Sequence, residues 1–452
     1  MRKSEGGVFG TTCARVGCMP SKLLIAAADN IHNYEKSEAF GIISEKPIVD
    51  GRLVMERVKR ERDRFVGFVL ESVDEIPSED KINGYASLKN NNTIIVNDLE
   101  IEATTIVIAT GSRPVYPKVW DELGDRLVIN DDVFNWDTLP KKVAVFGAGV
   151  IGMELGQALH RLNVDIKLFS MGGAVGALTD QEIKNYTENA LNEEFYFDIN
   201  SNVKSIERIK DQVKITYIHK DTCEEKIEYF DYLLAATGRR ANVDNLKIEN
   251  TCIELDERGI PIADKFTMKT SVNNIFIAGD ASNQLPLLHE ASDQGLIAGH
   301  NAAVYPVVNE GLRRTPISVV FSDPQIAMVG LTRKELDESY KTKDCYEVGT
   351  VSFENQGRSR VMLRNKGLLN IYAENGTGIL LGAEMIAPDA EHLAHLLSWV
   401  IQSKLTVKEI LDMPFYHPVI EEGVRTALRD VFSKIKSCEE LKESCFECGL
   451  GC

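Results

Sequence analysis

A short strand that leads directly into a glycine-rich turn and then a helix constrains this chain more than any other feature. Residues 143–146 are apolar and fit a buried strand, and Gly147-Ala-Gly149-Val-Ile-Gly152 follows at once. Residues 153–162 then carry apolar side chains at helical spacing. Gly147 allows the tight turn, Gly149 lets the backbone approach a pyrophosphate, and Gly152 lets the helix pack close to the strand. This order predicts a βαβ unit that binds a dinucleotide at the helix N-terminus.

The residue after the next strand bears on which dinucleotide binds. That strand is expected at Asp165–Phe169, and Ser170 follows it. In such units an acid at this position favours NAD, whereas a nearby arginine accommodates NADP. Ser170 is neither, so we expect NAD while the sequence leaves NADP open.

Three further stretches repeat the pattern of a buried strand that ends at glycine. Ile106–Pro114 is echoed by Leu233–Ala241, and Ile275–Asp280 is a third strand of this type. After Pro316, short alternating strands precede helices, which is typical of an α+β domain. The predicted class is therefore α/β, with two Rossmann-like nucleotide-binding domains and an α+β domain. Residues 114–140 are interpreted as a connector. Strands are expected at 318–321, 368–373 and 379–385, and helices at 288–304, 391–403 and 421–436.

Composition excludes several classes of protein. The 452 residues are enough for about three domains. Lys and Arg number 51 against 68 Asp and Glu, so the net charge of −17 would repel a nucleic acid. No apolar run approaches the roughly 18 residues of a membrane span, and we expect no secretory signal. Nine cysteines are too few for a disulfide scaffold, which favours a reducing, cytoplasmic location where particular thiols do chemistry.

Cys13 and Cys18 form the most specific chemical pattern in the chain. In a regular helix, residues five apart are separated by about 7.5 Å of rise. A disulfide requires its Cα atoms within roughly 4.4–6.8 Å. A bridge therefore needs a distorted helix start, which Gly17 and Pro20 permit, and a bridge under such constraint is comparatively easy to reduce. Two unrelated buried cysteines are the alternative interpretation of the spacing alone.

The segment from Gly10 to Lys22 resembles the active-site segment of the flavin disulfide reductases. The resemblance covers residues 5 to about 432 in order: the cysteine pair, Ala-Thr-Gly111, GxGxxGxELG, a second Ala-Thr-Gly238, Ala-Gly-Asp280 and a C-terminal His-Pro. Pro-Ser-Lys after the second cysteine is more like the lipoamide and mercuric branches than the glutathione branch. Membership implies FAD held between two nucleotide domains and a head-to-tail homodimer.

The resemblance also implies domain boundaries and roles for individual residues. The FAD domain would occupy 1–135 and 263–315, with the NAD(P) domain at 136–262, the dimerisation domain at 316–434 and a cysteine-rich tail at 435–452. Cys18 would lie against the flavin, and Cys13 would exchange with a dithiol. Lys22 and Glu154 would form an ion pair beside the flavin ring. Other residues implied to bind a cofactor are Ala86 near adenine, Asp280 at the ribityl chain, and Gly111, Gly238 and His289.

A histidine near the C-terminus resembles the base of this family. The family pattern His-Pro-Thr-x-x-Glu matches His417 and Glu422 rather than Glu421, with Val419 in place of Thr. A histidine held by a carboxylate can take a thiol proton near neutral pH. By resemblance it would act on the cysteine pair of the opposite subunit. This histidine argues against a mercuric reductase, which lacks it.

The front and the tail of the chain depart from the family pattern. Glu5 stands where the ribose-binding acid belongs. The glycine turn for the FAD pyrophosphate should precede such an acid by about 20 residues, which places it before Met1. We therefore expect either a truncated FAD domain or weak FAD binding. The tail carries Cys438, Cys445, Cys448 and Cys452, and Cys445 and Cys448 have metal-ligand spacing. Cys438 and Cys445 nevertheless continue an apolar stripe from Leu428, which favours an extended amphipathic helix over a redox or metal site. Cys223, Cys252 and Cys345 are isolated and interpreted as structural or incidental.

Together these patterns predict an FAD- and nicotinamide-dependent oxidoreductase, most like the dihydrolipoamide dehydrogenase branch. It would oxidise a dithiol such as a dihydrolipoyl group, with a lipoyl domain as one expected partner, and reduce NAD⁺. No nucleic-acid, membrane or resident metal partner is expected. Two alternatives stay open: a non-enzymatic nicotinamide-binding remnant, and a metal or thiol reductase that uses the tail cysteines.

Overall fold

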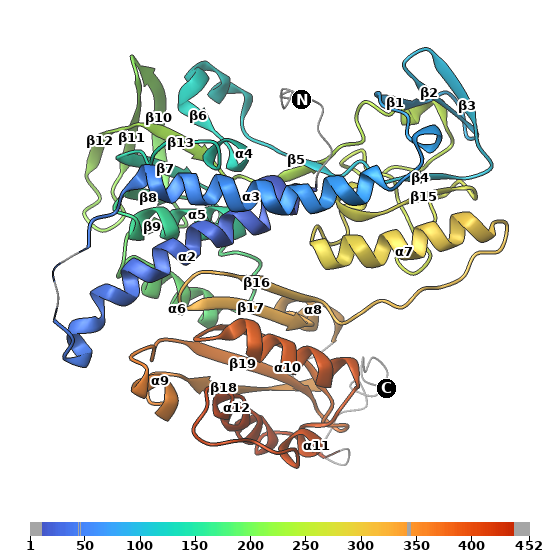
Figure 1. The fold of residues 1–452 in the computed structure, drawn as a ribbon. Helices are drawn as coiled ribbons and strands as arrows, with labels where there is room; N and C mark the ends of the chain where they lie inside the picture. Colours follow the sequence, from blue (N-terminus) through green and yellow to red (C-terminus); the bar gives the residue numbers. More distant parts are fainter. Residues whose placement is uncertain (1–10, 44, 46, 341–344, 438–452) are drawn as a thin grey trace. The chain divides into compact units, whose positions relative to one another are not determined.

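The computed structural model describes residues 11–43, 45, 47–340 and 345–437, which form two compact units (Figure 1). The first unit takes residues 1–20, 59–117 and 237–313, and the second takes 21–58, 118–236 and 314–452. The predicted α/β class is confirmed by the sheets and helices of both units. No helix in the described part of the chain is long and apolar enough to cross a membrane.

The first unit contains the strand-to-glycine repeats. Strand β4 (Ile106–Ile108) pairs in parallel with β15 (Ile275–Ile277), and both lie against helix α7 (Leu288–Val304). The bounds of α7 are those predicted. Strand β5 (Ser112–Pro114) pairs with β14 (Arg239–Ala241). The two strands directly follow Gly111 and Gly238, so this pairing joins the ends of the two repeats. A small antiparallel sheet completes the unit: β1 (Ala86–Leu88), β2 (Thr93–Val96) and β3 (Leu99–Glu102).

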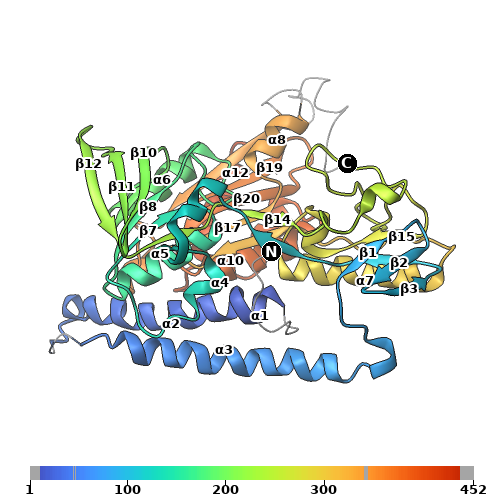
Figure 2. The same ribbon diagram turned by 90° about the horizontal axis from the view of Figure 1, so that it is seen from above.

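The second unit holds a five-stranded sheet in which every neighbouring pair is parallel. Its order is β6 (Leu127–Val128), β13 (Tyr232–Ala235), β7 (Lys142–Phe146), β8 (Asp165–Phe169) and β9 (Tyr196–Asp198). From β7 the chain passes through α5 (Val150–Arg161) to β8 on one side, whereas β13 lies on the other side. This reversal is the switch point at which such sheets bind nucleotides. Figure 2 shows a separate antiparallel ribbon, β10 (Asn202–Ile209), β11 (Gln212–Ile218) and β12 (Glu225–Phe230).

The stretch interpreted as a connector, residues 114–140, contributes to this sheet. Leu127 and Val128 are 4% and 5% exposed and form the edge strand β6. Two apolar residues are too few to show a period, so the sequence pattern could not reveal this strand.

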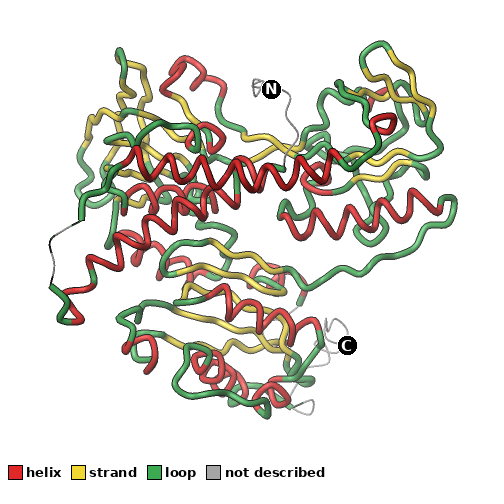
Figure 3. The backbone as a smooth tube through the Cα atoms, viewed as in Figure 1, coloured by secondary structure: helices red, strands yellow, loops and turns green. Residues whose placement is uncertain are grey.

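The C-terminal part of the second unit is an antiparallel sheet covered by helices (Figure 3). Its strands, in spatial order, are β16 (Ile317–Val320), β17 (Gln325–Gly330), β20 (Leu380–Ala387), β19 (Leu368–Glu374) and β18 (Tyr346–Ser352). Helix α10 (Ala390–Gln402) packs on β17 and β20, and α12 (Glu422–Phe432) packs on β18 and β19. The predicted strands and helices are therefore present within a few residues of their expected bounds.

The predicted extent of the last helix, to Lys436, is wrong. Helix α12 ends at Phe432, and residues 435–437 are not helical. The Lys436 N–H donates to Asn375 Oδ1 at 2.8 Å, and the Lys436 carbonyl accepts from the Gly376 N–H at 2.9 Å. These bonds to the β19–β20 turn replace the helical ones. The tail cysteines from Cys438 onward lie outside the described residues.

A buried polar seam joins α2 (Cys18–Glu35) to α5 in the second unit. Arg161 is 7% exposed and pairs with Glu194 at 2.6 Å, Asp323 at 3.2 Å and Asp29 at 3.3 Å. His32 lies 3.7 Å from Asp323. Because a buried charge is costly unless paired, this network fixes how the two helices cross.

Acid should destabilise the protein partly through His32. Burial, with the charges of Arg161 and Lys36 adding to it, lowers the pKa of His32 from 6.5 to about 4. The unfolded chain then binds a proton that the folded chain excludes. Stability that is fully present above pH 6.5 is therefore lost as the pH falls toward 4.

Urea midpoints measured across this pH window should fall less steeply for His32→Gln than for the parent protein. The pKa values of Asp323 and Glu194 are lowered, by Arg161 among other groups, so these carboxylates titrate mainly below the window. The exposed His300→Gln serves as the control and should keep the parent's slope. Equal slopes in all three proteins would exclude His32 as the titrating group.

Candidate functional site

The helix that carries the cysteine pair is broken between the two cysteines. Helix α1 (Thr12–Val16) is capped at its N-terminus by Thr11, whose Oγ1 accepts the Ala14 N–H at 3.2 Å. Gly17 caps its C-terminus, and α2 begins at Cys18. A Cβ at Gly17 would lie 2.9 Å from the Thr12 carbonyl oxygen, which explains the glycine. Cys13 is half-buried and Cys18 is exposed. The interruption that the sequence required for a bridge is present. The two sulfurs are not joined in a disulfide in this structure, so the bridge itself stays a prediction.

Lys22 and Glu154 form an ion pair in the second unit. The Lys22 Nζ donates to both carboxylate oxygens of Glu154 at 2.7 Å, and Glu154 is only 3% exposed. Ser21 Oγ donates to Glu154 Oε2 at 3.2 Å, and the Phe321 N–H donates to Oε1 at 3.0 Å. The ammonium also lies 4.4 Å from the centre of the Phe321 ring. Lys22 follows Cys18 by four residues on α2, about one turn.

The sequence did not predict two of the residues that bind Glu154, Ser21 and Phe321. Ser21 was visible within Pro-Ser-Lys but carried no separate signal. Phe321 contributes its backbone N–H, and a backbone contact leaves no mark on residue type.

Asp280 lies in a hydrogen-bonded loop of the first unit. The short helix η5 (Gly279–Ser282) carries it, and Asp280 Oδ2 accepts from Ser112 Oγ at 2.6 Å. Ser112 Oγ in turn accepts from Arg239 Nε at 2.8 Å. The contact connects β15 to the chain after Gly111, where φ is +67° and a side chain would be strained. Ser112 and Arg239 had no signal in the sequence.

One buried amide beside this loop has an unused donor. Gln294 is 0% exposed, and its Oε1 accepts from the Gly279 N–H at 2.9 Å and from Ser282 Oγ at 3.0 Å. Its Nε2 finds no acceptor among residues 11–437 where these are described. A buried donor normally finds an acceptor. An acceptor-rich group such as the ribityl-phosphate part of FAD fits this position, and Asp280 would hold hydroxyl groups beside it.

The glycine-rich turn of the second unit has the geometry that a dinucleotide requires. Gly147 has φ of +113°, and Gly149 caps α5 with open space where its Cβ would be. A Cβ at Gly152 would come within 1.9 Å of the Gly147 carbonyl oxygen. Ser170 follows β8, and its N–H donates to the Asp198 carbonyl at 2.7 Å. These residues fit a nicotinamide dinucleotide at the α5 N-terminus.

His417 and Glu422 are joined in the second unit. His417 Nδ1 lies 3.0 Å and 3.1 Å from the two Glu422 oxygens, and the imidazole is 80% exposed. Glu422 also accepts the Val419 N–H at 3.2 Å. The hydrogen bond from His417 lowers the pKa of Glu422 below its usual range. The carboxylate thus orients the ring so that Nε2 points away from it and can exchange a proton.

The remaining predicted residues are separate from these groups. Ala86 is exposed at the start of β1, Gly238 is exposed with φ of +119°, and His289 is exposed on the first turn of α7. Glu5 lies outside the described residues.

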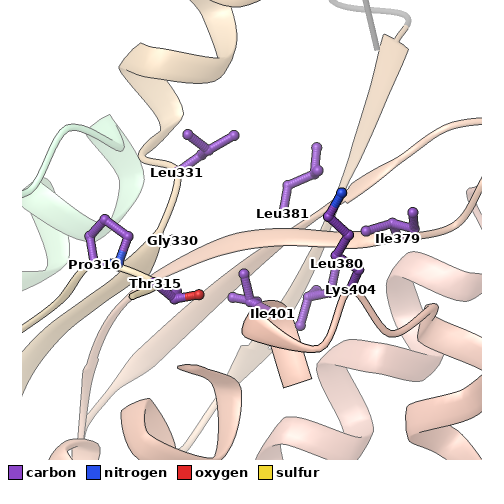
Figure 4. Close-up of a pocket in the computed structure, with 9 residues that line it drawn as sticks. All are labelled: Thr315, Pro316, Gly330, Leu331, Ile379, Leu380, Leu381, Ile401 and Lys404. Carbon is purple, nitrogen blue, oxygen red and sulfur yellow. The ribbon is translucent and has the colours of Figure 1, made fainter. Parts of the chain in front are cut away.

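A cavity of about 200 Å³ in the C-terminal sheet domain contains none of the predicted site residues (Figure 4). Apolar side chains and Lys404 surround it, and its residues are Thr315, Pro316, Gly330, Leu331, Ile379, Leu380, Leu381, Ile401 and Lys404. It is therefore not a part of the candidate site.

Comparison with known proteins identifies the family. The model for the pyridine nucleotide-disulphide oxidoreductases matches residues 5–295, and the model for the dimerisation domain of these proteins matches residues 317–428. The dihydrolipoyl dehydrogenase of Chlamydia pneumoniae is 29% identical over 421 residues, which are 91% of this chain and 87% of the relative. That of Bacillus subtilis (strain 168) is 29% identical over 424 residues, 92% of this chain and 88% of the relative.

Solved structures share the fold. The HOCl-induced flavoprotein disulfide reductase RclA of Escherichia coli aligns with a TM-score of 0.77 at 24% identity, covering 96% of this chain and 93% of that chain. The chain therefore belongs to the pyridine nucleotide-disulphide oxidoreductase family, whose enzymes depend on FAD and bind NAD(P). Within this family it is close to dihydrolipoyl dehydrogenase.

Two alanine substitutions in the glycine-rich turn should have different effects, one on stability and the other on NADH binding. Gly152→Ala should lower the free energy of unfolding by about 1–3 kcal/mol, because its Cβ meets backbone. Gly149→Ala should leave stability within about 0.5 kcal/mol, because its Cβ meets open space. It should nevertheless weaken NADH binding, because the methyl group occupies the path of the pyrophosphate. Urea unfolding and NADH titration measure both effects, and equal destabilisation by the two variants would contradict this geometry.

Proposed function

We propose that this protein oxidises a dithiol, such as a protein-bound dihydrolipoyl group, and reduces NAD⁺. The observation that carries the proposal is the break in the helix at Gly17, between Cys13 and Cys18. Both cysteines lie in the segment that resembles the active-site segment of the flavin disulfide reductases. The likeness to dihydrolipoyl dehydrogenases over most of the chain supports the same substrate class. The His417–Glu422 pair supports a thiol substrate over a metal ion, since a thiol must lose a proton before it attacks.

The proposed reaction exchanges one disulfide for another. A substrate thiolate attacks Cys13 Sγ, and the Cys13–Cys18 bond breaks with Cys18 leaving as a thiolate. The second substrate thiolate then attacks the substrate sulfur in the mixed disulfide and releases Cys13. His417 accepts a thiol proton, and Glu422 holds the imidazole in one orientation. The chemistry that FAD supplies when bound is two-electron transfer between the cysteine pair and the nicotinamide.

The remaining residues bind and orient. Gly149 at the α5 N-terminus would hold the nicotinamide dinucleotide pyrophosphate, and Asp280 with Gln294 would hold FAD. Lys22 and Glu154 would keep a fixed, paired charge at the flavin ring. NAD is our proposal for the nicotinamide, because no arginine follows β8 directly to receive a 2′-phosphate.

The cysteine pair should respond to NADH. In the FAD-loaded protein, Cys13 and Cys18 should resist alkylation before NADH is added and become alkylated afterwards, because reduction releases both thiols. Trypsin separates the two cysteines at Arg15, so peptide mass mapping reads each one. Cys252→Ser, a change at an exposed free thiol, is the control. Alkylation that is complete before NADH would refute the redox pair.

His417 should serve the cysteine pair of the other subunit of a homodimer. Cys13→Ser and His417→Ala should each inactivate the enzyme as a homodimer. In hybrids, one site carries both lesions and the other carries none, so equal random mixing should restore about a quarter of the parent's dithiol oxidation rate. The matched control mixes Cys13→Ser with Glu421→Gln. Glu421 neighbours Glu422 in the chain, but it is Glu422 that contacts the histidine, so this change leaves the His417–Glu422 pair intact. If subunits exchange and no activity returns, the base acts within its own chain.

A further inference from the structure

Glu384 is a buried carboxylate that the proposed reaction does not use. It lies in β20, where every residue is buried, and it is 0% exposed. Its cross-strand neighbour in β19, Asn370, is buried as well. A charge inside such a strand is costly unless donors surround it, so its partners show what this position requires.

The donors to Glu384 come largely from the end of the segment between β8 and α6 (Gln181–Asn192). Glu384 Oε2 accepts the Thr179 N–H at 2.6 Å and the Asp180 N–H at 2.9 Å. Oε1 accepts from Thr179 Oγ1 at 2.6 Å and from the N–H of Arg333, the first residue of α8 (Arg333–Ser339), at 2.8 Å. Asp180 caps α6, which packs on β19 and β20. One carboxylate therefore holds the chain that leads into α6 on the C-terminal sheet.

The same segment lies against the dinucleotide turn. Residues 170–180 connect β8 to α6 and begin with Ser170, the residue expected to read the adenosine ribose. The Gly176 N–H donates to the carbonyl of Ala148, inside the glycine-rich turn, at 2.7 Å. Thr179 comes three residues later, and three residues extend no further than about 11 Å. The hydrogen bonds to the buried carboxylate therefore limit how far this segment can move from the turn.

We propose that Glu384 is a positioning residue for the adenosine half of the nicotinamide dinucleotide. Its carboxylate holds residues 170–180 against the glycine-rich turn, so that Ser170 and the turn are in place before the ligand arrives. The apparent affinity of a ligand falls with the fraction of the protein that has the binding arrangement. This inference rests on the proposed nicotinamide site and adds to it a residue of the C-terminal sheet.

Two substitutions weaken this anchor to different degrees. Glu384→Met keeps a long side chain and removes both acceptor oxygens, which leaves the Thr179 and Asp180 N–H groups without their acceptor. Glu384→Gln keeps one oxygen, but a neutral amide accepts weaker hydrogen bonds than a carboxylate. The glutamine variant also keeps the shape of the side chain, so it secures the test should the methionine variant fail to fold.

Binding to the full chain is measured by calorimetric titration with NADH and with ADP-ribose, which lacks the nicotinamide. Glu384→Met should raise the Kd of both ligands about tenfold, and Glu384→Gln should raise both by a smaller factor. Equal losses for the two ligands place the effect in the adenosine half that they share. In the FAD-loaded enzyme, the KM for NAD⁺ should rise in the same order while kcat stays at the parent's value, because the reacting ring is not touched.

Glu374→Gln is the matched control. Glu374 is a buried carboxylate of the neighbouring strand β19, and it accepts from the Tyr340 hydroxyl at 2.7 Å and from Thr377 Oγ1 at 2.6 Å. Neither partner belongs to residues 170–180, so this change should lower the melting temperature without altering the Kd of NADH.

The possible results separate this inference from the site on which it rests. Unchanged NADH binding in the folded Glu384 variants, or an equal loss of binding in Glu374→Gln, would overturn the positioning role. Failure of the parent chain to bind either ligand would instead overturn the proposed nicotinamide site, and this inference with it.

Discussion

The buried carboxylate of Glu154 is the interaction on which the second unit depends most. It is 3% exposed and receives the Lys22 ammonium, the Ser21 hydroxyl and the Phe321 N–H. Helices α2 and α5 and the end of β16 therefore meet at one side chain. A buried charge that loses its partner destabilises a protein by about 3–5 kcal/mol. Because the buried Glu154 carboxylate needs a partner for stability, the Lys22 ammonium is held in place about one turn from Cys18.

The same helix faces extend this polar seam away from the candidate site. Gln157 and Arg161 follow Glu154 on α5 and bind the Asp323 segment, through its backbone and its carboxylate. Each of these buried polar groups has a partner, so the network holds the loop after β16 in place. The Lys22–Glu154 ion pair and the Arg161 network are in this way built from successive turns of the same two helices.

Local patterns in the sequence were sufficient for several elements. The β8 strand and helix α7 have the bounds expected from their apolar runs, and Gly17 breaks its helix as the cysteine spacing required. The pattern failed where long-range contacts decided the outcome. Strand β6 is too short to show a period, and α12 ends at Phe432 because Asn375 and Gly376 bind Lys436.

The sequence by itself determined the chemistry of the chain: a cysteine pair, a dinucleotide turn and a histidine followed by a carboxylate five residues later. These are local spacings, and spacing along a chain is what a sequence records directly. Tertiary structure decided which groups share those sites. Phe321 reaches Glu154 through its backbone, and Ser112 and Arg239 bind beside Asp280. Such contacts join residues far apart in the chain and depend on how strands and helices pack, which residue type alone does not encode.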